Sequence, residues 1–84
     1  MAQHSERAKA NTRKQIELQI KTIQANITSL EKERVKTLSY SGKGLNEDFI
    51  KKAVKNIDNT IVIRKKQLAD YEATKAKYEK DGLI

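Results

Sequence analysis

The sequence predicts an all-α protein, an antiparallel two-helix hairpin with coiled-coil-like packing. The chain has 84 residues with no Pro and only three Gly, so little in its length breaks a helix. Its large aliphatic residues recur in alternating steps of four and three residues, the spacing that places side chains on one face of a helix. Two of the glycines lie close together near the middle, where the chain can reverse direction.

A polar N-terminal segment, residues 1–11, precedes the first apolar repeat. It has no large apolar side chain after Met1, and we expect a flexible arm that either frays or extends the following helix. Helix 1 is predicted at about residues 12–40. Its apolar face begins with five residues in steps of four and three: Ile16, Ile20, Ile23, Ile27 and Leu30.

The end of helix 1 departs from that spacing. Continued steps of four and three would reach Arg34 and Thr37, but the apolar residues Val35 and Leu38 lie one position further on. A nearly straight helix produces such a drift, because its turn of about 3.6 residues does not match the repeat. We therefore expect Val35 and Leu38 to take the core positions.

A turn is predicted at residues 41–45, within the only cluster of helix-breaking residues in the sequence. Gly42 and Gly44 supply the positive φ angles that a tight reversal and a helix end require. Asn46 then has the character of an N-cap, because two acidic residues follow it in the first turn of the next helix.

Helix 2 is predicted at about residues 46–81, and residues 82–84 form a short tail that leaves the helix at Gly82. Folding the chain about Lys43 matches the apolar faces of the two helices in register. The apolar face of helix 2 continues in steps of four and three around two cations, and comprises Ile50, Val54, Ile57, Ile61, Leu68, Tyr71 and Tyr78.

The two cations on this face are Arg64 and Lys75. We expect the Arg64 side chain to extend past Ile23 to solvent or to pair with an acid. The candidate acids are Asp70 and Glu17. A polar residue at such a position fixes the register of two helices at some cost in stability.

Four large apolar residues lie off these faces: Leu18, Phe49, Val62 and Ile63. A two-helix hairpin buries only one stripe of each helix, so these side chains call for another cover. Three structures could bury them: a broader core, a homodimer resembling a four-helix bundle, or the groove of a partner.

The formal net charge of +7 favours contact with polyanions, anionic lipid or an acidic protein surface. Positive charge is concentrated on helix 2, where Asp58 is the only acid between Phe49 and Lys66. This is either a solvated face that keeps the domain soluble or a face that binds phosphate groups or an acidic protein. The candidate partner-binding residues are Phe49, Lys51, Lys52, Lys55, Val62, Ile63, Arg64, Lys65 and Lys66.

The sequence offers no site for catalysis, a metal or a cofactor. There is no Cys, and the only histidine, His4, lies in the polar segment without a second ligand. Paired carboxylates such as Glu31 and Glu33 are two residues apart and point to different sides of a helix. We therefore expect a non-enzymatic protein without a cofactor.

No apolar stretch approaches the roughly 20 residues that span a bilayer, and the N-terminal segment lacks the apolar core of a signal peptide. Together with the absence of Cys, these features favour a cytoplasmic protein. They also make a membrane partner unexpected.

The turn is similar in its place to that of small secreted hairpins of the WXG100 class, in which Trp-x-Gly joins two helices. Tyr40-Ser41-Gly42 occupies that place here. The sequence has no Trp, and four positions after Tyr78 it has Gly82 instead of the acid of the C-terminal signal of that class. We do not assign the chain to it.

Three functions are open. In the leading hypothesis, the hairpin docks on a larger protein or macromolecular assembly through helix 2 from Phe49 to Lys66, as an adaptor, inhibitor or assembly factor. In the second, the Lys and Arg residues of the same helix bind nucleic acid through its phosphates, without sequence readout. In the third, the hairpin opens and its seams join chains in a structural coiled coil, although the turn glycines count against this arrangement.

Overall fold

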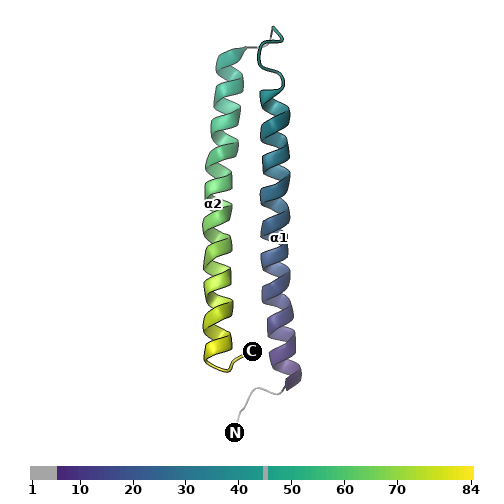
Figure 1. Cartoon of the computed structure of the whole chain (residues 1–84), viewed down its shortest axis with the longest axis vertical. Helices are drawn as coiled ribbons and strands as arrows, with labels where there is room; N and C mark the ends of the chain where they lie inside the picture. Colours follow the sequence, from purple (N-terminus) through teal and green to yellow (C-terminus); the bar gives the residue numbers. More distant parts are fainter. Residues whose placement is uncertain (1–5, 45) are drawn as a thin grey trace.

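The computed structural model describes residues 6–44 and 46–84, which form two antiparallel helices joined by one turn (Figure 1). Helix α1 covers Glu6–Leu38 (33 residues) and helix α2 covers Glu47–Lys80 (34 residues). Each helix is about 50 Å long at about 1.5 Å per residue, and the molecule measures 68 × 16 × 14 Å. The predicted all-α helical hairpin is confirmed.

Helix α1 begins at Glu6, so residues 6–11 of the predicted arm extend the helix instead of fraying. Arg, Lys and Ala favour helix in this stretch, and Glu6 places a negative charge at the positive end of the helix dipole. The Thr12 hydroxyl also donates a hydrogen bond to the carbonyl oxygen of Ala8 at 3.0 Å, one helical turn earlier. Residues 1–5 lie outside the described residues.

The chain leaves α1 at Leu38 and reverses through residues 39–44. Gly42 and Gly44 have φ angles of 79° and 80°, in the left-handed region that disfavours any residue with a side chain. The predicted reversal is therefore confirmed, although Leu45, the last residue of the predicted turn, lies outside the described residues.

Asn46 caps the N-terminus of α2, as predicted. Its side-chain oxygen accepts hydrogen bonds from the backbone N–H groups of Asp48 at 2.9 Å and Phe49 at 3.2 Å. These bonds satisfy two of the donors that the first turn of a helix leaves without a partner. The helix therefore has a fixed starting point beside the turn.

The far end of α2 folds back toward α1. Gly82 has a φ angle of 76°, and the Leu83 N–H donates to the Tyr78 carbonyl oxygen at 2.9 Å, which ends the helix as predicted. The Arg13 Nη2 atom of α1 donates to the Ile84 carbonyl oxygen at 2.9 Å. Figure 1 shows the C-terminal residues beside the first turns of α1.

The core is a single line of isoleucines between the two helices. Five of them retain only 5–9% of their surface exposed: Ile23, Ile27, Ile50, Ile57 and Ile61. Other residues of the two predicted faces are half-buried, because both flanks of a two-helix hairpin are open to water: Ile16, Ile20, Leu30, Val54, Leu68 and Tyr78. The predicted faces are thus confirmed, with Tyr71 slightly more open at 37% exposed.

The expected drift at the end of α1 is wrong. Val35 is 67% exposed and Leu38 is 42% exposed, whereas Arg34 and Thr37 are half-buried. Arg34 keeps the strict spacing because its Nε atom donates to Asp58 Oδ1 across the seam at 2.6 Å. An ion pair thus holds the position that we expected an aliphatic side chain to take.

Three ion pairs join the helices, and all three agree with one register along the hairpin. They are Arg13–Glu79 at 3.7 Å, Glu17–Lys75 at 3.3 Å and Arg34–Asp58 at 2.6 Å. From one pair to the next, the α1 partner advances by as many residues as the α2 partner retreats, as antiparallel helices require. In each pair the cation is a residue of the seam, which is the interface between the two helices. Each acid directly follows a seam residue, and the three acids occupy the same heptad position. All three ion pairs therefore lie on one side of the hairpin, which we call the charged flank.

Candidate docking surface on helix 2

The nine predicted partner-binding residues do not all face the same way. Arg64 lies on the seam and is half-buried, whereas the other eight are exposed. Lys51 and Lys65 lie one heptad before and after Asp58, and therefore on the charged flank. The remaining six lie on the side of α2 that points away from α1, which we call the outer face: Phe49, Lys52, Lys55, Val62, Ile63 and Lys66.

Val62 and Ile63 show how open the outer face is. Ile61 before them is only 8% exposed because it packs against α1, and Arg64 after them is half-buried. Val62 and Ile63 point the other way and are 66% and 55% exposed, and Phe49 at the start of α2 is 71% exposed. Their predicted position off the seam is confirmed, and the core of the hairpin does not broaden to cover them.

Lysines surround these apolar side chains without forming pairs inside the chain. Among residues 6–44 and 46–84, no ion pair or side-chain hydrogen bond involves Lys51, Lys52, Lys55, Lys65 or Lys66. The acid that lies among them, Asp58, is already paired with Arg34. An uncompensated positive field therefore remains along α2.

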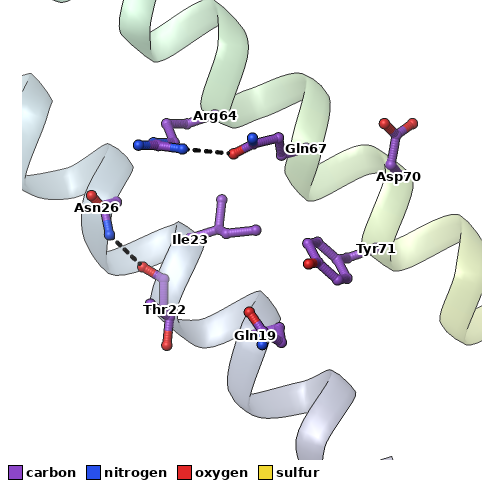
Figure 2. Close-up of a pocket in the computed structure, with 8 residues that line it drawn as sticks. All are labelled: Gln19, Thr22, Ile23, Asn26, Arg64, Gln67, Asp70 and Tyr71. Atoms are coloured by element: carbon purple, nitrogen blue, oxygen red, sulfur yellow. Dashed lines mark hydrogen bonds between the residues drawn. The ribbon is translucent and has the colours of Figure 1, made fainter.

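Arg64 occupies a polar groove between the helices, on the flank opposite the ion pairs (Figure 2). Its Nη1 atom donates to Gln67 Oε1 at 2.9 Å, and its Nε atom is buried with no hydrogen-bond partner in the described part of the chain. Neither expected acid pairs with it, because Asp70 points away in Figure 2 and Glu17 pairs with Lys75. Arg64 therefore lies on the seam, and none of the other eight predicted partner-binding residues lines this groove.

The rest of this groove is polar and weakly charged. The Asn26 amide donates to the Thr22 carbonyl oxygen at 3.2 Å, and the Tyr71 ring points into the space between the helices beside Ile23 (Figure 2). Asp70 also lines the groove, with its carboxylate directed away from Arg64 (Figure 2). Apart from Ile23 and Tyr71, the groove is thus lined by polar and charged side chains.

A second groove lies on the charged flank beside the turn, and we call it the turn-end groove. Leu38 at the end of α1 and Ile50 and Val54 at the start of α2 are its apolar residues. It has a volume of about 390 Å³. Its polar lining comprises Ser41, Glu47, Lys51, Asp58 and, where the groove borders the outer face, Lys55. Leu38 was expected in the core, although strict steps of four and three would have placed it beside the seam, where it is 42% exposed.

Glu47 ties the turn to the first turn of α2. Its Oε1 atom accepts the Gly42 N–H at 2.8 Å, and its Oε2 atom accepts the Ser41 hydroxyl at 2.9 Å. These two hydrogen bonds, helped by the nearby charge of Lys51, lower the pKa of Glu47 below its ordinary value. The carboxylate is thus ionised and engaged with the turn.

The described residues contain no group of three or more His, Cys, Asp or Glu side chains that is able to hold a metal ion, and His4 lies outside them. In the same part of the chain, neither helix has a segment that is long and apolar enough to cross a membrane. Comparison with protein-family models, curated proteins and solved structures found no match to the chain.

Proposed function

We propose that the protein is a non-enzymatic docking protein that binds an acidic, partly apolar surface of a larger protein or assembly through α2. The observation that carries the proposal is the exposure of Val62 and Ile63, at 66% and 55%, in the middle of a helix whose seam is already filled. An apolar centre with a polar rim is the usual anatomy of a protein interface. Binding of this kind suits an adaptor, an inhibitor or an assembly factor.

The lysines around this centre support an acidic partner. Lys66 follows Val62 by four residues and Ile63 by three, so it lies one turn away on the same side of the helix. Near the turn, Lys52 follows Phe49 by three residues, and Lys55 follows Lys52 by three residues. Each therefore lies one helical turn after the residue before it. Charges at the rim of an interface speed encounter with an oppositely charged partner and disfavour a positively charged one.

Nucleic-acid binding is the second candidate, favoured by the five unpaired lysines of α2 between Lys51 and Lys66. Lysines bind phosphates without reading sequence, and such binding falls steeply as the salt concentration rises. The exposed side chains of Phe49, Val62 and Ile63 have no role in contacts with a phosphate backbone. Their prominence favours the protein partner.

The hairpin itself counts against the third hypothesis, an opened structural coiled coil. The two seams meet within one chain, and the turn is stabilised by the left-handed Gly42 and Gly44 and by the hydrogen bonds to Glu47. A homodimer of closed hairpins is the remaining competitor for the outer face. Its test is the mass of the protein in solution.

The proposal is tested by fluorescence anisotropy with four labelled probes across a salt series. The probes are a designed amphipathic helical peptide with Leu on one face and Glu elsewhere, a scrambled peptide of the same composition, a short DNA duplex and a single-stranded RNA. We expect the amphipathic peptide to bind more tightly than the other three. Tighter binding of DNA or RNA, with a steep loss on adding salt and no preference between the peptides, would contradict the docking proposal.

Variants of the outer face provide the specificity control. We expect Phe49→Ala and Ile63→Ala to weaken peptide binding while the far-ultraviolet circular dichroism stays unchanged, because both side chains are exposed. Leu18→Ala is the matched control, since Leu18 is 62% exposed but lies on α1. An equal effect of all three substitutions would show that peptide binding does not depend on α2.

A further inference from the structure

We infer that the turn-end groove is the anchor site for an acidic amphipathic helix of the partner, with one large apolar side chain of that helix on Leu38 and its carboxylates on Lys51 and Lys55. This inference rests on the proposed docking function and names the partner's chemistry. It also extends the surface from α2 to the last turn of α1, which the sequence had assigned to the core.

The floor of the groove offers an unfilled apolar contact. Ile50 is the most buried residue of the core, at 5% exposed, and Val54 is half-buried, so both are fixed in place. Leu38 beside them is 42% exposed, because the chain turns away directly after it and no other segment within residues 6–44 and 46–84 covers it. An apolar side chain from a partner helix would complete the layer that Leu38 and Ile50 begin, as in helix-in-groove recognition.

In this groove the hydrogen-bonding oxygens of both acids are engaged, whereas the two lysines make no ion pair, with Lys51 near enough to Glu47 to help lower its pKa. Both acids are engaged, Glu47 with the N–H of Gly42 and the hydroxyl of Ser41, and Asp58 with Arg34. Lys51 and Lys55 have no ion-pair partner within the described residues. They are four residues apart on one helix, and so lie on the same side of it. A partner helix with carboxylates at a similar spacing complements both.

A second copy of this chain fits the groove poorly. Symmetric pairing through the groove would bring Lys51 and Lys55 of both copies into one small interface, and the whole chain has a formal net charge of +7. A phosphate backbone would satisfy the lysines and leave Leu38 exposed. An acidic amphipathic helix is the occupant that satisfies both the apolar floor and the cationic rim.

The other end of the hairpin supplies a matched control. Leu18 is 62% exposed on α1, and Lys14 and Lys21 lie four residues before it and three residues after it. This site resembles the turn-end groove in composition, but no residue of α2 lines it. Substitutions at both sites therefore change charge and exposed apolar surface by similar amounts.

The experiment is isothermal titration of the full chain with the same amphipathic Leu/Glu peptide. We expect Leu38→Gln, and separately the double variant Lys51→Glu/Lys55→Glu, to weaken binding about tenfold or more, as substitutions at interface anchors do. The control variants Leu18→Gln and Lys14→Glu/Lys21→Glu should change affinity by less than about threefold. Circular dichroism of every variant checks that the helices are retained.

Two results would overturn parts of this account, and they are distinguishable. If the groove variants bind like the controls while Phe49→Ala and Ile63→Ala still lose affinity, the groove inference fails and the docking function stands. If the unmodified chain shows no preference for the amphipathic peptide over its scrambled form, the docking function fails and the groove inference with it.

Discussion

Adjacent residues of α2 provide the sharpest test of which way this helix faces. Ile61 is 8% exposed and Val62 is 66% exposed, although the two are neighbours in the sequence. Replacing each in turn by Ala removes aliphatic carbons from the same turn of the helix. The two substitutions should nevertheless differ greatly in their effect on the free energy of unfolding.

The expected magnitudes follow from burial. Ile61→Ala removes three carbons that are almost fully buried, which at about 0.8 kcal/mol each gives a loss of about 2.5 kcal/mol. The flanks of the hairpin are open, so a remaining cavity can relax and adds little, which places the value near the lower end of the observed range of about 2–5 kcal/mol. Val62→Ala removes two mostly exposed carbons, about 0.5 kcal/mol, and gains about as much because Ala forms helix better than Val.

The assay is urea unfolding followed by circular dichroism. With a slope of about 1 kcal/mol per molar urea, Ile61→Ala should lower the midpoint by about 2.5 M, and Val62→Ala should leave it nearly unchanged. This loss is a large share of the total stability, which for a chain of this length is on the order of 4–12 kcal/mol. Equal destabilisation by the two substitutions would show that Val62 is covered in solution and that the outer face is not free.

Three further predictions concern the turn and the seam. Gly44→Ala should lower the free energy of unfolding by at least about 1 kcal/mol in thermal melts, because a residue with a side chain disfavours the φ angle of 80°. An added Cβ would meet nothing within 4 Å in the described chain, so this loss comes from the backbone conformation and not from a clash. The pKa of Glu47 is lowered by folding, so its contribution to stability is present above its ordinary pKa of 4.5 and is lost as the pH falls through the lower folded value. Glu47→Gln should therefore flatten the acid side of a profile of melting temperature against pH. An unchanged profile would contradict this prediction. A double-mutant cycle of Arg34→Ala and Asp58→Ala should give a coupling energy below about 1 kcal/mol that decreases with added salt, since both side chains are nearly half-exposed.

Much of the fold follows from spacing alone. Steps of four and three from Ile16 to Leu30 and from Ile50 to Tyr78 predicted both helices and their mutual register, and two glycines before Asn46 predicted the turn. These signals are local, because a helix face is defined by residues one turn apart and a cap by residues two or three apart.

The errors arose where contacts between the helices decide the outcome. Val35 was assigned to the core from its apolar character, but the ion pair of Arg34 with Asp58 keeps the strict spacing and leaves Val35 exposed. Arg64 was expected either to extend past Ile23 to solvent or to pair with an acid, and it donates to Gln67, three residues along its own helix. Which acid a seam cation reaches depends on the register and on side-chain conformations, and no local pattern specifies them.

The candidate site was predictable in part. Exposure of Val62 and Ile63 follows from their place between the seam residues Ile61 and Arg64, which a helical repeat fixes. The turn-end groove was not predictable, because it requires Leu38 of α1 to lie beside Ile50 of α2 without being covered. That arrangement depends on where the chain turns after Leu38.

The central claim is that the outer face of α2 is free to bind a different protein, and the mass in solution tests it most directly. We expect sedimentation equilibrium to give the monomer mass of 9.6 kDa over a wide range of protein concentration, because chains with a net charge of +7 repel one another. A dimer mass that returns to the monomer value in the variant Val62→Glu/Ile63→Glu would contradict the account, since a second copy of the chain would then cover the outer face.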